Sequence, residues 1–135
     1  MAGLNYPADL KYATTDEWVR VAGDEATIGI SDYAQSQLGE IVFLDLPWDD
    51  VGQREIAASG KYGDVDSVKA TSELYSPVAG TIIRVNADLK EHPEIVNQDP
   101  YGNGWMIVVK LSGTPDLGAL MDADAYQRYN DDRDH

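Results

Sequence analysis

One lysine of this 135-residue chain lies in a segment whose pattern suits a chemically accessible amine. Residues 64–68 and 72–75 both have strand character, Lys69 lies between them, and Pro77 reverses the chain soon afterwards. A hairpin of this kind would hold the amine outward, in a stretch with few other charges. The same pattern fits a lysine that only keeps a β-hairpin soluble, so the spacing leaves both interpretations open.

Other residue types that commonly carry chemistry are sparse. The chain has no cysteine, which excludes thiol nucleophiles, thiolate metal sites and disulfides. Its two histidines are His92, in a polar turn, and His135, the last residue of an acidic tail. A Ser–His–Asp triad would need one of them, and no histidine pair or calcium-binding loop pattern occurs. We therefore predict no catalytic residue and no metal site.

The net charge of the chain indicates which classes of molecule it disfavours as binding partners. The chain has 24 acidic and 10 basic side chains, a net charge of −14, and 43 % of its residues are hydrophobic. That apolar content favours a folded domain over a disordered acidic tail. The negative field disfavours nucleic acids and anionic membranes, which bind clustered lysine and arginine. Residues 61–115, which include Lys69, are nearly balanced, with 7 acidic and 5 basic side chains.

No targeting or membrane segment is recognisable. The first residues show neither the basic and apolar regions of a signal peptide nor an arginine- and serine-rich transit pattern. No stretch approaches the roughly 18 apolar residues of a membrane span. We expect a cytoplasmic protein, although a processed organellar chain would show the same pattern.

Short strands separated by turn residues predict a mainly β fold, a barrel or sandwich with small helices. Strands are expected at residues 18–21, 26–30, 41–46, 54–58, 64–68, 72–75, 81–85 and 105–111. A short helix is expected at residues 32–38, N-capped by Ser31 and closed by Gly39. A C-terminal helix is expected at residues 116–129, and its candidate apolar contacts are Leu117, Leu120, Met121 and Tyr126.

This pattern divides the chain into three parts. Residues 1–10 form an N-terminal extension, residues 11–115 the β-barrel domain, and residues 116–135 a C-terminal helix with an acidic tail. Three aromatic residues are expected in the core, namely Trp18, Phe43 and Trp105.

The segment around the lysine has a family counterpart. Asp66-Ser67-Val68-Lys69-Ala70 resembles the E-S-V-K-A motif that carries lipoyl-lysine in H proteins of the glycine cleavage system. Further similarities follow in the family's order from about Lys11 to Tyr126. They include Glu17-Trp18-Val19-Arg20, Ile28-Gly29-Ile30-Ser31-Asp32-Tyr33-Ala34-Gln35, Gly39-Glu40-Ile41-Val42-Phe43, Ser76-Pro77-Val78-Ala79-Gly80 and Asp99-Pro100-Tyr101-Gly102.

Three departures from the family pattern are visible. Asp66 replaces the usual glutamate three residues before the lysine and keeps its charge. Asp16 stands where many members have histidine, and residues 47–62 fit only loosely. None of these changes removes the carrier lysine.

The resemblance implies a lipoyl-domain-like flattened β-barrel, or barrel-sandwich hybrid, with lipoic acid attached as an amide at Lys69. It implies a carrier protein that catalyses no step itself. The implied partners are the pyridoxal-phosphate glycine decarboxylase (P protein), the tetrahydrofolate-dependent aminomethyltransferase (T protein) and dihydrolipoyl dehydrogenase (L protein). A lipoate ligase or a lipoyl/octanoyl transferase would attach the group. A free carrier of this kind is expected to be a monomer.

Four residues acquire roles through the resemblance. Asp66 and Glu73 flank Lys69 and are interpreted as recognition marks for the lipoylating ligase. Thr15, Glu17 and Glu73 are interpreted as lining a cleft that shields the loaded arm and pairs its cationic amine with a carboxylate. The alternative for Glu17 is an exposed strand residue. Tyr75 is either a cross-strand packing partner or part of a docking surface.

Other functions remain open at this level. The same lysine would serve a lipoyl or octanoyl relay between proteins, or a sulfur-transfer pathway. An unmodified β-barrel interaction module would use no cofactor, and a small acidic hydrolase would need His92 beside a nucleophile.

Overall fold

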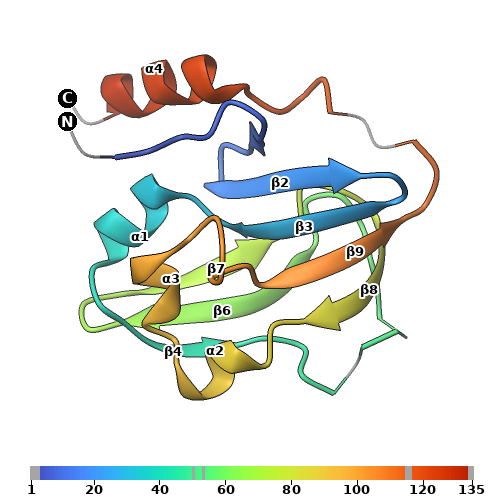
Figure 1. Ribbon diagram of the computed structural model, residues 1–135. Coiled ribbons are helices and arrows are strands. Elements are labelled where there is room, and N and C mark those ends of the chain that lie inside the picture. Colours follow the sequence, from blue (N-terminus) through green and yellow to red (C-terminus); the bar gives the residue numbers. More distant parts are fainter. Residues whose placement is uncertain (1–3, 50, 53, 115–116, 134–135) are drawn as a thin grey trace.

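The computed structural model describes residues 4–49, 51–52, 54–114 and 117–133, and its strands form two antiparallel sheets (Figure 1). One sheet has six strands in the order β1-β2-β3-β9-β8-β5, and the other has three in the order β4-β6-β7. The strands are β1 (Lys11–Tyr12), β2 (Glu17–Ala22), β3 (Glu25–Ile30), β4 (Ile41–Asp45), β5 (Glu55–Ile56), β6 (Lys61–Ser67), β7 (Thr71–Tyr75), β8 (Gly80–Val85) and β9 (Ile107–Leu111).

The core lies between these two sheets. Ile28 and Val109 from the larger sheet belong to one buried cluster with Leu44, Val65 and Leu74 from the smaller sheet. Alternation along each strand produces this cluster, since successive side chains point to opposite faces. The architecture confirms the predicted flattened barrel-sandwich, and every strand expected from the sequence overlaps an observed one.

The first helix also forms where the sequence predicts it. Helix α1 spans Asp32–Leu38, the Ser31 hydroxyl accepts the N–H of Ala34 at 3.1 Å, and Gly39 ends the helix at a φ of 76°. Two further helices, α2 (Asp88–Glu91) and α3 (Ile95–Gln98), were not predicted. Each has a single turn, which is too short to show a helical period in the sequence.

The predicted C-terminal helix is wrong at its N-terminal end. Helix α4 spans Ala123–Arg133, whereas residues 117–122 are not helical. The backbone of Met121 exchanges two 2.8 Å hydrogen bonds with Tyr12, which holds Met121 extended beside β1. Asp122 then accepts the N–H of Ala125 at 2.8 Å, and the helix begins there. The predicted start at Asp116 lies outside the described residues.

The prediction of three core aromatic residues is wrong for one of them. Trp18 is fully buried and Trp105 is partly buried, but Phe43 is 53 % exposed. The register of β4 against β6 shifts between Ile41 and Phe43. Such a bulge inserts one residue into the strand, so Val42 and Phe43 both face outward while Ile41 and Leu44 stay in the core.

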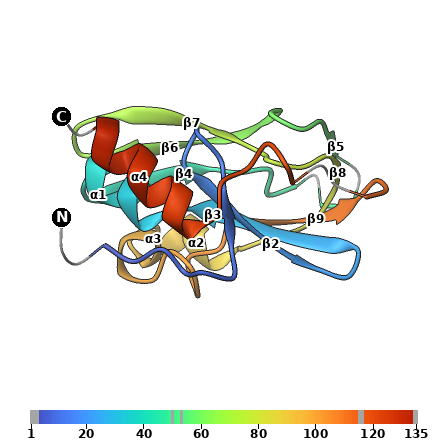
Figure 2. The ribbon, with the colours of Figure 1, turned by 90° about the horizontal axis from the view of Figure 1, so that it is seen from above.

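A second buried cluster fastens the C-terminal helix to the sheets. It is built mainly from aromatic side chains, with the rings of Tyr12 and Tyr126 stacked at a centroid distance of 4.6 Å. The Tyr126 hydroxyl contacts the Ser31 hydroxyl at 2.5 Å, which ties α4 to the start of α1. The two helices therefore lie at the same end of the molecule (Figures 1 and 2). None of the helices formed by the described residues is long and apolar enough to cross a membrane.

Candidate functional site

Lys69 lies in the short turn that joins β6 to β7. Ser67 closes this turn twice, because its backbone N–H donates to the Ala70 carbonyl at 2.8 Å and its hydroxyl accepts the Ala70 N–H at 3.1 Å. Serine is favoured at the first position of such turns for this reason. Neither Val68 nor Lys69 has a positive φ, so the turn carries no backbone strain of that kind. The predicted hairpin tip is confirmed, with Lys69 exposed on it.

The tip lies against the C-terminal end of α1. A Cβ built on Gly39 would lie 3.6 Å from the Cε of Lys69, and the Val68 N–H donates to the Glu40 carbonyl at 3.0 Å. The hairpin is therefore held at its tip as well as along its strands. Among the described residues, no carboxylate forms an ion pair with Lys69.

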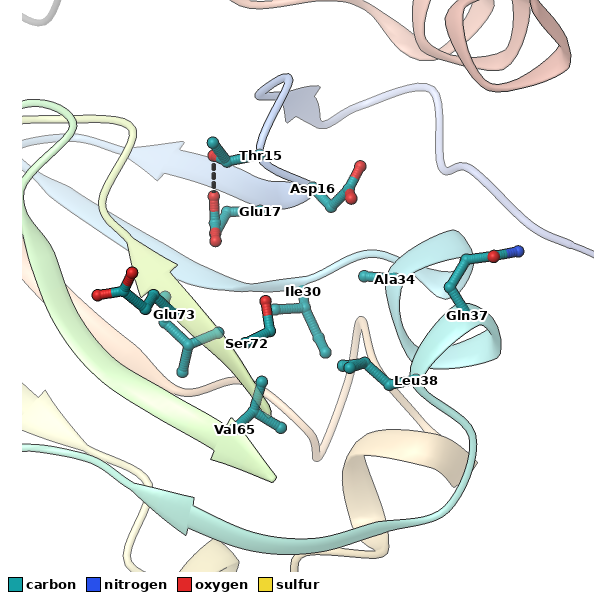
Figure 3. Close-up of a pocket in the computed structure, with 11 residues that line it drawn as sticks. Thr15, Asp16, Glu17, Ile30, Ala34, Gln37, Leu38, Val65, Ser72 and Glu73 are labelled. Carbon is teal, nitrogen blue, oxygen red and sulfur yellow. Dashed lines mark hydrogen bonds between the residues drawn. The ribbon is translucent and has the colours of Figure 1, made fainter. Parts of the chain in front are cut away.

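A cleft of about 160 Å³ opens beside the hairpin, between α1, the start of β2 and the edge strand β7 (Figure 3). Its walls combine apolar side chains with three carboxyl groups, two hydroxyls and one amide. The lining residues are Thr15, Asp16, Glu17, Ile30, Ala34, Gln37, Leu38, Val65, Ser72, Glu73 and Leu74. The structure thus brings together the three residues that the sequence suggested for an arm cleft, Thr15, Glu17 and Glu73.

Glu17 is the buried carboxyl of the cleft, with only 1 % of its surface exposed. The alternative of an exposed strand residue is therefore wrong. The Thr15 hydroxyl donates to Oε1 of Glu17, and the Tyr75 N–H donates to Oε2 at 3.2 Å. Burial raises the pKa of Glu17 from 4.5 to about 8, and these two hydrogen bonds offset only part of that effect. At neutral pH the carboxyl is mostly protonated.

Glu73 has the opposite electrostatic character at the rim of the same cleft. Its carboxylate accepts from Lys61 Nζ at 3.1 Å and from the Tyr75 hydroxyl at 3.0 Å. The hydrogen bond from Lys61, followed by that from Tyr75, holds the pKa of Glu73 below its usual value. The cleft therefore combines a neutral acid inside with an ionised carboxylate at the rim, a separation that suits different roles for the two groups.

Asp66, the other predicted recognition residue, lies outside this cleft. It is half-buried and in register with Phe43 on one side and Thr71 on the other. Paired residues of neighbouring strands share a face, and Phe43 faces outward. The structure thus separates Asp66 from Thr15 and Glu17, while Glu73 borders both the cleft and the outer face.

Sequence reasoning missed the part that Asp16 plays at the cleft. Asp16 has a φ of 79°, and its carboxylate points away from Glu17 (Figure 3). It accepts from the Tyr126 hydroxyl at 2.8 Å and forms an ion pair with Arg133, both on α4. The C-terminal helix thereby holds the turn that presents Thr15 and Glu17. The only signal in the sequence was the aspartate at a position where many family members have histidine.

His92, the histidine that the described residues include, lies at the surface. His92 is exposed, and its Nδ1 lies 3.3 Å from a carboxylate oxygen of Glu94, so the two form a surface pair. His135 lies outside the described residues. Within the described part of the chain, no group of three or more histidine, aspartate and glutamate side chains is placed to hold a metal ion.

Comparison with known proteins places this architecture in a family. The family model described as glycine cleavage H-protein matches residues 10–133. The chain belongs to the glycine cleavage H-protein family. A glycine cleavage system H protein of Nitratidesulfovibrio vulgaris is 55 % identical over 121 residues, which cover 90 % of this chain and 92 % of that protein. One of Geobacillus kaustophilus is 48 % identical over 124 residues, covering 92 % of this chain and 95 % of the relative.

The fold agrees with a solved member of the family. A crystal structure of a glycine cleavage system H protein from Mycobacterium marinum superposes with a TM-score of 0.83 at 33 % sequence identity. The match covers 92 % of this chain and 98 % of that one.

Membership in the family establishes the general role. The chain is a lipoyl carrier of the glycine cleavage system, and its cofactor is covalently attached lipoic acid. That role brings it to the P, T and L proteins of the system.

Proposed function

We propose that Lys69 is the residue that carries the lipoyl group. The supporting observation is its position at the apex of a hairpin that Ser67 closes, with an exposed side chain and no carboxylate partner among the described residues. An amine must be neutral to be acylated, and an ion pair would oppose the loss of its proton. When attached, the lipoyl group supplies a dithiolane that accepts the aminomethyl group of glycine.

We further propose that the cleft between α1 and β7 shelters the loaded arm. Ser72, which lines the cleft, is three residues from Lys69, or roughly 10 Å along an extended strand. Leu38 and Val65 offer apolar contact to a methylene chain, and Glu17 lies inside with Thr15 beside it. Removing the bound amine from water would slow loss of the aminomethyl group by hydrolysis.

The buried Glu17 gives this cleft selectivity for a cationic cargo. With an empty cleft its pKa is about 8, so a proton occupies the carboxyl at neutral pH. A cationic amine beside it favours the ionised form, because opposite charges in a low dielectric attract strongly. Loading therefore releases a proton from Glu17 and forms an ion pair that is shielded from solvent. Thr15 holds the carboxylate in position by its hydrogen bond.

These groups bind and protect, and we assign no catalytic step to the chain. Asp66 and Glu73, which flank the tip, are proposed as recognition residues for the enzyme that attaches lipoate, a ligase or a lipoyl/octanoyl transferase. The carrier is proposed to act as a cytoplasmic monomer that tethers its cargo for delivery between enzymes.

Intact-mass measurement after incubation with lipoate, ATP and a lipoate ligase tests the attachment site. We expect one lipoyl increment on the wild type and on Lys61→Arg, which keeps the charge that pairs with Glu73, and none on Lys69→Arg. An increment that persists in Lys69→Arg would refute the assignment. Absence of any increment on the wild type would favour an unmodified interaction module.

The lifetime of the aminomethyl load tests the cleft. We expect release of the load from Glu17→Gln at least tenfold faster than from the wild type, because glutamine cannot form the ion pair. Glu55→Gln, an exposed change on β5, serves as the control. If the load has the same lifetime on Glu17→Gln as on the wild type, the proposal that the cleft protects it is refuted.

A lipoyl or octanoyl relay, or a sulfur-transfer pathway, is the second candidate function. It would use the same Lys69, so attachment alone does not separate the two. Exchange of the glycine carboxyl carbon with bicarbonate, dependent on glycine decarboxylase, is expected of a glycine cleavage carrier and not of a relay protein.

A further inference from the structure

The outer face of the three-stranded sheet has a composition that the cleft and the lipoyl-lysine do not explain. Three hydrophobic side chains are exposed there and at the adjoining tip, Val42 at 48 %, Phe43 at 53 % and Val68 at 66 %. Val68 is next to Lys69, and its N–H donates to the carbonyl of Glu40, the residue before β4. The apolar group therefore begins directly beside the lysine.

Carboxylates in register lie beside this apolar group. Asp45, Asp64 and Glu73 lie opposite one another across β4, β6 and β7, and in the next row Asp66 lies between Phe43 and Thr71. Like charges directly opposite on neighbouring strands destabilise a sheet. Lys61 offsets the repulsion between Asp64 and Glu73, because its Nζ lies 3.1 Å from a carboxylate oxygen of each. No cation of the described chain pairs with Asp45 or Asp66.

We propose that this outer face is the docking surface for the enzyme that acylates Lys69, and that this enzyme presents an apolar pocket for Phe43 ringed by lysine and arginine side chains. The proposal rests on the assignment of Lys69 as the lipoyl-lysine. Exposed aromatic side chains with a charged rim are typical of the residues that dominate binding energy in protein interfaces. The unpaired carboxylates provide the charge complementarity.

The acylating enzyme fits this face better than the enzymes that handle the cargo. Val65, Ser72 and Leu74 line the cleft, whereas Phe43 and Asp66 belong to the opposite face of the same sheet. A partner centred on Phe43 and Asp66 reaches the tip and touches the cleft only at its rim, at Glu73. It does not contact Glu17 inside the cleft, so it does not sense whether the cleft holds a loaded arm. Acylation acts on the bare lysine, before any arm occupies the cleft, and needs no such distinction.

Steady-state lipoylation kinetics with lipoate, ATP and a lipoate ligase test the proposal. We expect Phe43→Ser to raise KM for the carrier at least tenfold with little change in kcat. Val21→Ser, which changes a 38 % exposed side chain on β2, should leave KM unchanged. Asp45→Asn should raise KM severalfold and weaken its dependence on salt, whereas Asp24→Asn on the β2–β3 turn should do neither. Thermal unfolding of each variant verifies that the fold is intact.

The outcomes separate this proposal from the one on which it depends. If the wild type takes no lipoyl group on Lys69, the attachment site itself fails. If the wild type is lipoylated and Phe43→Ser has the same KM, only the docking surface is refuted. A third measurement uses Phe43→Ser that has been fully lipoylated by prolonged incubation. The rate of glycine–bicarbonate exchange with that protein should equal the rate with the lipoylated wild type. A lower exchange rate with Phe43→Ser would overturn the assignment of this face to the acylating enzyme.

Discussion

Replacing Glu17 by glutamine should change how the stability of the fold depends on pH. In the folded chain, burial raises the pKa of Glu17 from 4.5 to about 8. In the unfolded chain the carboxyl is in water and loses its proton near the ordinary value. Between these two pH values the folded state binds more protons than the unfolded state, so stability falls as pH rises. The contribution is fully present below pH 4.5 and is lost as pH approaches 8.

The size of the effect follows from the two pKa values. Each unit of difference corresponds to about 1.36 kcal/mol, so a rise from 4.5 to about 8 amounts to about 5 kcal/mol of stability lost between acidic and alkaline pH. Glutamine has the same shape, and its side-chain oxygen can still accept the Tyr75 N–H, but it does not titrate. The free energy of unfolding of Glu17→Gln should therefore gain about 5 kcal/mol relative to the wild type over this range.

Urea unfolding at pH 4.5, 6, 7 and 8.5, followed by the fluorescence of the three tryptophans, measures this difference. The comparison between variant and wild type cancels the titration of all other groups. Glu55→Gln changes an exposed carboxyl of the same type and serves as the control. If the unfolding free energies of Glu17→Gln and the wild type run parallel across the four pH values, the buried carboxyl is not held protonated by the fold and the reasoning is refuted.

Three further substitutions test the contacts that position the site. Ser67→Ala should lower the free energy of unfolding by about 1 kcal/mol and speed hydrogen exchange of the Ala70 amide, as measured by NMR, and unchanged exchange would contradict the closed tip. Arg133→Gln should destabilise the fold by about 1 to 3 kcal/mol in thermal unfolding, because it leaves Asp16 without its ion pair; an unchanged Tm would show that α4 does not hold this turn. In Gly29→Ala the new Cβ would lie 2.9 Å from the Trp18 ring, so the urea midpoint should fall by an amount equivalent to about 1 to 3 kcal/mol, and a wild-type midpoint would argue against that packing.

Features with a local cause were predictable from the sequence. Helix α1 begins and ends where Ser31 caps it and Gly39 adopts a positive φ, and both effects involve only a few neighbouring residues. The hairpin tip at Lys69 likewise depends on Ser67 and the strands beside it. The lipoyl motif is also local, so the sequence predicts both the family and the proposed attachment residue.

Features caused by contacts between distant segments were not predictable in this way. The start of α4 depends on backbone pairing between Met121 and Tyr12, and a helical pattern along residues 116–129 cannot reveal that competitor. The outward position of Phe43 depends on a bulge that exists only because β4 pairs with β6. In each case the sequence shows a local propensity, and pairing with a distant segment decides the conformation of Met121 and the exposure of Phe43.

The difference between features with local causes and features with distant causes is clearest within the site. Turn residues and strand alternation act over a few residues, so the mainly β architecture, the exposed tip and the position of its lysine could be predicted from the chain alone. The burial of Glu17, the hydrogen bonds of its oxygens with Thr15 and Tyr75, and the ionised state of Glu73 beside Lys61 depend instead on how distant segments pack in the folded protein. The pKa of a carboxyl depends on its solvent exposure and on its partners in space, which come here from the turn before β2 and from strands β6 and β7.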